Sequence, residues 1–115
     1  MAQKLFDYNL ALERLGGDEQ FLNELLMDLI EQIDDTLDNI KQAIAEEDFD
    51  NLKTLSHSLK GASANLNVSR MASHFLQLEG LGMENTVDGA SDLIELVTKD
   101  RNDLEAFLNQ MDVAL

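Results

Sequence analysis

Apolar residues recur at three- and four-residue steps over most of the chain, which is the spacing of amphipathic helices. The clearest run follows Asp18, a residue type favoured at helix N-caps, and predicts a helix of roughly 27 residues and about 40 Å. Acidic residues fill most of its polar positions. Its apolar positions are Leu22, Leu25, Leu26, Leu29, Ile33, Leu37, Ile40 and Ile44.

Two segments beside this run also predict helices. A short helix is predicted from about Asp7 to Leu15, ended by Gly16 and Gly17. Another begins after Asp48 or Asp50 as the N-cap. Its apolar stripe is formed by Leu52, Leu55, Leu59, Ala62 and Leu66.

The C-terminal half predicts two more helices. One has Ser69 as its N-cap and ends in the glycine-bearing stretch 80–82, and it carries Met71, Phe75 and Leu78. The last runs from about Asp88 to Leu115. Its apolar positions are Leu93, Leu96, Val97, Leu104, Phe107, Leu108 and Met111.

Four substantial helices joined by short loops pack most simply as a bundle. We therefore expect an all-α fold, an antiparallel four-helix up-down bundle with a short additional N-terminal helix, in a single domain over residues 1–115. Composition agrees, because the chain has no proline and only 5% aromatic residues, which disfavours a sheet protein.

Charge and composition exclude several function classes. With 23 Asp and Glu against 8 Lys and Arg, the net charge of −15 disfavours nucleic acid and anionic lipid as partners. The chain has no cysteine, no nucleotide-binding glycine motif and no histidine pair spaced for a metal. No apolar run approaches the roughly 18 residues of a membrane span, so the expected location is cytoplasmic.

His57 is the one anomaly of the pattern. On a helical projection it lies about 170° from the middle of its helix's apolar stripe, so it faces solvent. Lys53, Lys60, Gly61 and Ala64 share its side of the helix. A glycine inside a helix costs about 1 kcal/mol relative to alanine, which suggests that something large approaches this backbone closely.

The charge pattern marks the same region. Residues 51–78 contain no Asp or Glu, although they hold both histidines, Lys53, Lys60 and Arg70. Such a window in an acidic protein favours an anion or an acidic partner surface. His74 lies on the flank of its helix's apolar stripe and is expected to be a half-buried structural residue, with Glu79 on the opposite flank.

Each of these signals has a structural explanation when taken alone. An exposed helical histidine is usually a solvated surface residue, and a single glycine inside a helix can simply permit tight packing at a helix crossing. Their coincidence on one helical turn favours a functional site. The alternative is an acidic helical adaptor that binds a basic partner, in which His57 is incidental.

The segment 57–66, HSLKGASANL, resembles the signature of histidine-containing phosphotransfer (HPt) domains, a His, any residue, then Leu-Lys-Gly. The block that ends in Leu78-Glu79 resembles the family's second motif, and the opening helices fit as well. Asn67 stands where the family commonly has Gly; we expect no harm, because Asn tolerates the left-handed turn. Phe75 stands where the family often has Cys.

The resemblance implies phosphorelay signalling. His57 would accept a phosphoryl group from a receiver-domain aspartate, helped by Lys60, while Glu79 would accept the Nδ1–H of the imidazole. Lys53, Gly61, Ala64 and Leu76 would contribute to receiver docking. The domain would be a monomer without kinase activity or a cofactor of its own. The receiver would supply Mg²⁺. The resemblance is compatible with a stand-alone domain and with a domain of a hybrid sensor histidine kinase.

Overall fold

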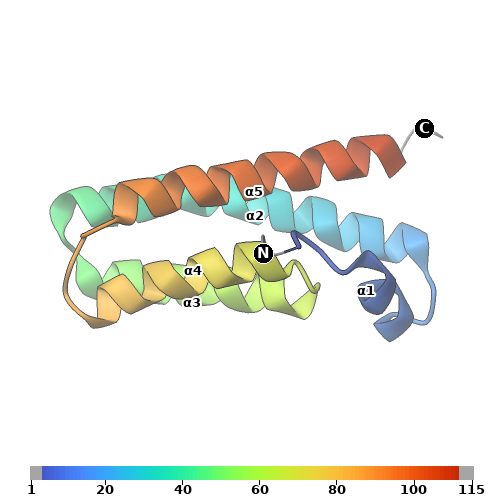
Figure 1. Cartoon of the computed structure of the whole chain (residues 1–115), viewed down its shortest axis with the longest axis horizontal. Coiled ribbons are helices and arrows are strands. Elements are labelled where there is room, and N and C mark those ends of the chain that lie inside the picture. The colour runs from blue at the N-terminus through green and yellow to red at the C-terminus, as the bar shows by residue number, and fades with distance from the viewer. Residues whose placement is uncertain (1–3, 112–115) are drawn as a thin grey trace.

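The described part of the computed structural model, residues 4–111, folds into five helices and contains no strand. They are α1 (Tyr8–Arg14), α2 (Glu19–Glu46), α3 (Phe49–Asn65), α4 (Ser69–Met83) and α5 (Ala90–Met111). Helix α3 packs against α2 and α4, and α5 packs against the same two helices, which closes a ring of four (Figure 1). The predicted all-α bundle with a short first helix is confirmed.

Aspartates begin three of the helices. The side chains of Asp7, Asp18 and Asp48 accept hydrogen bonds from the backbone N–H three residues on, which satisfies otherwise free donors at the starts of α1, α2 and α3. The prediction that Asp18 is an N-cap is confirmed. Of the two candidates for the N-cap of α3, Asp48 occupies that position and Asp50 lies in the first turn of the helix. The prediction for Ser69 is wrong, because Val68 is the N-cap of α4 and makes no side-chain cap bond.

The glycines have two different roles. Gly16 and Gly17 adopt positive φ angles of 72° and 84° after α1, as their predicted place at a helix end requires. Helix α4 ends at Met83, one residue beyond the predicted stretch 80–82, so Gly80 and Gly82 lie within its last turn. A Cβ on Gly82 would lie 2.8 Å from the backbone N of Lys53 and 2.8 Å from the carbonyl O of Phe49. Gly82 therefore lets α3 and α4 approach closely.

The buried stripe of α3 differs from the predicted one. Leu52, Ser56, Leu59 and Ser63 are buried, whereas Leu55, Ala62 and Leu66 of the predicted stripe are only half-buried. The reason is the close contact between α3 and α4. The small side chains of Ser56 and Ser63 are buried in that contact, and the residues of α3 that face α2 are left partly exposed. Leu96, predicted to lie in the core, is 41% exposed. The side chain of Met111 and residues 112–115 lie outside the described part.

The N-terminal segment is hydrogen-bonded to the turn between α3 and α4. The backbone N–H of Asp7 donates to the carbonyl of Asn67 at 3.0 Å, and Arg14 Nη1 donates to the Asn67 side chain at 3.0 Å. Asn67 itself has φ 61°, the left-handed conformation expected of it. Phe6, Tyr8 and Phe107 pack edge to face or tilted, which joins this end of the molecule to α5.

Candidate functional site

His57 lies in the middle of α3, on the side opposite the buried stripe. Its side chain is 65% exposed, as the helical projection predicts. Its Nδ1 lies 2.8 Å from Oε2 of Glu79, which projects from α4. The exposed imidazole is therefore held at one nitrogen by the neighbouring helix.

Glu79 is a buried carboxylate that contacts two basic side chains. It is 11% exposed, and its Oε1 lies 2.9 Å from Nζ of Lys60, which is one helical turn from His57 on α3. The ion pair with Lys60, and then the hydrogen bond from His57, lowers the pKa of Glu79 below its ordinary value against the opposing effect of burial. Glu79 is therefore ionised at neutral pH.

This contact selects one tautomer of His57. An ionised carboxylate can only accept, so the nitrogen that faces it, Nδ1, carries the hydrogen. In the neutral ring Nε2 then holds the free lone pair. The two ring nitrogens point away from each other, so Nε2 is directed away from Glu79 and α4. The arrangement presents a nucleophilic nitrogen to an incoming electrophile.

The other predicted site residues on α3 differ in their exposure and in their contacts. Lys60 contacts Glu79 rather than pointing freely into solvent. Lys53 and Ala64 are exposed on α3, and Lys53 makes no ion pair with the side chains of residues 4–110. A Cβ on Gly61 would meet nothing within 4 Å. Its bare backbone is thus not needed for packing against the part of the chain that the structure describes.

Leu76 is the one predicted docking residue that lies on α4. It is 54% exposed, and Met83, seven residues further along the same helix, is 66% exposed. Both therefore lie on the solvent side of α4.

His74 belongs to a different cluster. Its side chain is 14% exposed, and its Nδ1 contacts Oδ2 of Asp100, a buried residue of α5. Arg70 Nε donates to the other oxygen of Asp100 at 2.7 Å, and Arg70 also reaches Asp103. The prediction of a half-buried structural histidine agrees with this position, which ties α4 to α5.

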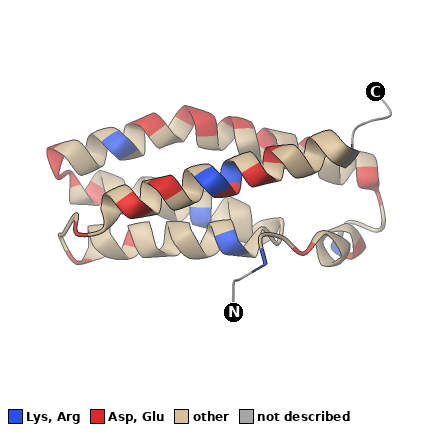
Figure 2. Cartoon of the chain, turned by 45° about the horizontal axis from the view of Figure 1, so that its top comes forward, with Lys and Arg blue, Asp and Glu red and all other residues tan. Residues whose placement is uncertain are grey.

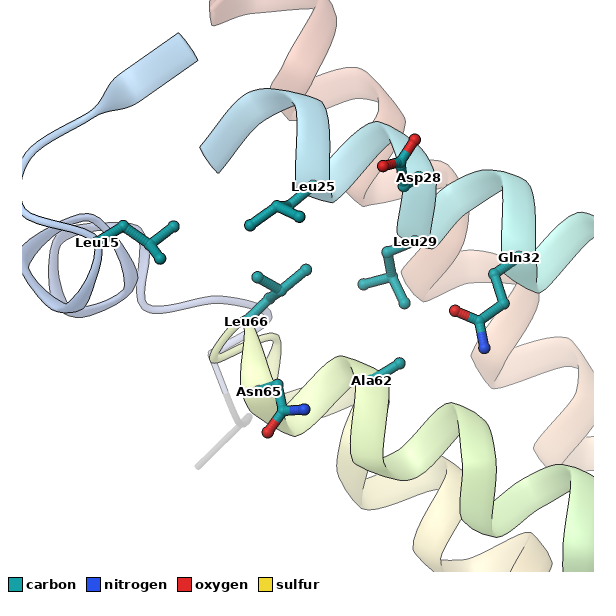
Figure 3. Close-up of a pocket in the computed structure, with 8 residues that line it drawn as sticks. All are labelled: Leu15, Leu25, Asp28, Leu29, Gln32, Ala62, Asn65 and Leu66. Carbon is teal, nitrogen blue, oxygen red and sulfur yellow. The ribbon is translucent and has the colours of Figure 1, made fainter. Parts of the chain in front are cut away.

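One feature near the site was missed at the level of sequence. An apolar groove of about 390 Å³ lies between α2 and the C-terminal end of α3 (Figure 3). Leu25, Ala62 and Leu66 line it, and the sequence pattern placed all three in the core. A two-helix groove leaves no mark in the periodicity, because a half-buried leucine and a buried one occupy equivalent positions.

The charges are divided between the helices. Helices α2 and α5 carry most of the acidic residues, whereas α3 and α4 are nearly free of them (Figure 2). Among the residues that the structure describes, no group of three or more His, Cys, Asp or Glu is placed to hold a metal ion. Within the same residues, no helix has the length and apolar character needed to cross a bilayer.

The comparisons with known proteins define the class. The family model of the Hpt domain matches residues 24–114. The chain belongs to the Hpt domain family. Its function is phosphotransfer in a phosphorelay, as an intermediate and not a kinase, through interaction with response-regulator receiver domains.

The fold has a solved counterpart. The crystal structure of histidine-containing phosphotransfer protein B (HptB) from Pseudomonas aeruginosa PAO1 matches with a TM-score of 0.84 and 20% sequence identity, over 96% of each chain. At this identity the likeness concerns the fold. The comparison with curated proteins found no match.

Proposed function

We propose that His57 is the phosphoacceptor and that its Nε2 is the reacting atom. The observation that carries this assignment is the 2.8 Å contact between Nδ1 and Glu79, which leaves Nε2 free on an exposed ring. His74 is the other histidine of the chain, and it is nearly buried against Asp100. An incoming receiver therefore reaches only His57 without unpacking the bundle.

The proposed reaction transfers a phosphoryl group between two side chains. The Nε2 lone pair attacks the phosphorus of the receiver's phosphoaspartate in line, and the aspartate oxygen leaves with the electrons of the P–O bond. No proton needs to move, and the ring becomes a cation that keeps its Nδ1–H. The ionised Glu79 faces that hydrogen, so it stabilises the charge that develops on the ring. Onward transfer reverses these steps with a second receiver.

Lys60 and Lys53 have separate roles in this proposal. Lys60 holds the Glu79 carboxylate in place and keeps it ionised, because Lys60 is the main cause of its lowered pKa. Lys53 is exposed and contributes positive charge beside a phosphoryl group. Gly61 and Ala64 leave space for the partner's loops, and Leu76 is assigned to the outer margin of the contact. We expect the Mg²⁺ that assists the transfer to be supplied by the receiver, and the domain to act as a monomer in the cytoplasm.

The test is transfer from phosphorylated receivers. Receiver domains from the same genome are phosphorylated with acetyl phosphate and Mg²⁺, then mixed with the wild-type domain or with His57→Gln. We expect acid-labile, base-stable label on the wild type alone. His74→Gln serves as the matched control and should accept label normally. Receiver binding without label on the wild type would instead indicate the adaptor function.

A further inference from the structure

Gly82 and Glu79 lie one helical turn apart on α4, and both contact α3. Gly82 lies against the backbone of Lys53, and Glu79 contacts His57, four residues after Lys53 on α3. Residues three or four apart share one side of a helix, so both contacts belong to the same antiparallel crossing of α3 and α4. They are separated by about 5–6 Å along the helices. A change in the helix distance at Gly82 therefore reaches the reactive imidazole one turn away.

The two helices approach more closely at Gly82 than any side chain there would allow. A Cβ would lie 2.8 Å from the backbone N of Lys53, 2.8 Å from the carbonyl O of Phe49 and 2.9 Å from the Cβ of Lys53. The N and the O are four residues apart in one helix, the pair that a helical hydrogen bond joins, so neither atom can rotate out of the way. Ordinary contact begins at about 3.4 Å. An added methyl group therefore moves α4 away from α3 by more than half an ångström.

The turn of α3 between these two contacts is also small. Ser56 is fully buried, and in the described part of the chain its hydroxyl has no hydrogen-bond partner. Burial of an unpartnered hydroxyl costs free energy, so a polar contact does not explain the serine. Its small volume does, because a larger side chain would hold α4 away from α3. Ser56 and Gly82 thus permit the close crossing from both helices.

The contacts of Glu79 depend on this distance, because both of its partners lie on α3. Its carboxylate oxygens lie 2.8 Å from Nδ1 of His57 and 2.9 Å from Nζ of Lys60. The side chain of Glu79 is only 11% exposed, so it has little room to follow a displaced partner. Hydrogen bonds between N–H and O extend to about 3.2 Å. A crossing widened by more than half an ångström thus separates the carboxylate from the imidazole.

We propose that Gly82 is a positioning residue for phosphotransfer. It holds α4 at the distance from α3 at which Glu79 reaches Nδ1 of His57, and through Glu79 it keeps the hydrogen on Nδ1 and leaves Nε2 free. Gly82 itself is buried, so it acts through Glu79 and not by contact with a partner. This inference rests on the proposed function, in which Nε2 of His57 is the reacting atom.

The test compares Gly82→Ala with two control variants. Gly80→Ala adds the same methyl group to α4 at a position where a Cβ would meet nothing within 4 Å in the described part of the chain. Leu104→Ala removes a buried side chain of α5 and lowers stability. Leu104 adjoins Asp103, which contacts Arg70 at the start of α4, the opposite end of that helix from Gly82.

Two measurements report on the imidazole without a partner. Nitrogen-15 NMR gives the tautomer of the neutral His57 ring, and phosphoramidate labels the ring by transferring its phosphoryl group with release of ammonia. Both are made at a temperature at which circular dichroism shows each variant folded. If Gly82→Ala is unfolded alone, it is compared with the wild-type glycine in the Gly80→Ala background, where α4 is stabilised. A double-mutant cycle with Glu79→Gln shows whether Gly82 acts through Glu79.

We expect Gly82→Ala to shift the ring away from the Nδ1–H tautomer and to slow phosphoramidate labelling roughly threefold to tenfold. In the Glu79→Gln background the same substitution should change the rate by less than about twofold. Gly80→Ala and Leu104→Ala should keep the wild-type tautomer and rate. Wild-type values in Gly82→Ala, or an equal slowing with and without Glu79, would overturn the positioning role and leave phosphotransfer at His57 intact.

Failure of the proposed function has a different signature. If phosphorylated receivers bind the wild type and leave no label on His57, phosphotransfer is contradicted. The tautomer of His57 in Gly82→Ala still decides whether Gly82 positions Glu79, because that measurement requires neither a receiver nor a phosphoryl group.

Discussion

Glu79 holds the imidazole of His57 at the nitrogen that does not react: its Oε2 lies 2.8 Å from Nδ1, and its other oxygen lies 2.9 Å from Nζ of Lys60. A buried carboxylate on one helix thus orients an exposed nucleophile on another. Because the bond is charge-assisted, it is expected to affect both the tautomer and the stability of the cation formed during transfer.

Replacement of Glu79 tests this orientation. Glu79→Gln keeps the shape but removes the charge, so we expect transfer to His57 to slow roughly 10- to 100-fold, the value of a charged hydrogen bond converted to rate. Nitrogen-15 NMR should show that the neutral ring loses its preference for the Nδ1–H tautomer. An unchanged tautomer and an unchanged rate would show that Glu79 only fills space.

Replacement of Lys60 tests the origin of the ionised carboxylate. In Lys60→Met the pKa of Glu79 should rise toward the ordinary value of 4.5, since Lys60 is its main lowering influence. A group with a lowered pKa in the folded state stabilises the fold fully above pH 4.5 and loses this contribution as pH falls through the lowered value. The stability difference between Lys60→Met and the wild type should therefore shrink below pH 4.5.

Carbon-13 NMR titration of the Glu79 carboxyl and urea unfolding at several pH values measure the two effects. Lys53→Met is the matched control, because Lys53 has no ion pair within residues 4–110. It should leave the titration of Glu79 in place. A Glu79 titration that is the same in Lys60→Met and the wild type would assign the lowered pKa to other groups.

The sequence predicted the long helices, their N-terminal aspartates and the exposure of His57, because each of these follows from local periodicity and capping. It did not predict the close α3–α4 crossing at Gly82, since a glycine signals a helix end and a close helix crossing equally well. The groove beside Ala62 could not be predicted from the sequence either. Its existence depends on the distance between α2 and α3, which the residue pattern of one helix does not encode.

Gly80 and Gly82 give opposite expectations although they are two residues apart in α4. A Cβ on Gly82 would lie 2.8 Å from backbone atoms of α3, so Gly82→Ala should lower the free energy of unfolding by about 1–3 kcal/mol. A Cβ on Gly80 would meet nothing within 4 Å, so Gly80→Ala should raise it by about 0.5–1 kcal/mol. Urea unfolding of the two variants measures the contrast, and equal effects would contradict the close α3–α4 crossing.

His74 is expected to contribute to the stability of the fold and to have no part in phosphotransfer. Removal of its imidazole in His74→Ala leaves the buried Asp100 with one partner fewer, and we expect a loss of about 1–3 kcal/mol in the free energy of unfolding. Transfer to His57 at a temperature where the variant is folded should be unchanged. A loss of transfer with unchanged stability would give His74 a part in the reaction.

A substitution at Gly61 is expected to affect the stability of α3 and the access of the partner in opposite directions. Because a Cβ would meet nothing within 4 Å, Gly61→Ala should stabilise α3 by about 0.5–1 kcal/mol while it places a methyl group between His57 and the partner. We therefore expect a higher unfolding midpoint, slower transfer from receivers and normal labelling by phosphoramidate. Gly80→Ala is the matched control, with the same gain in stability and normal transfer. Receiver transfer at the wild-type rate in Gly61→Ala would mean that the partner does not approach this turn of α3, and that the glycine serves neither packing nor docking.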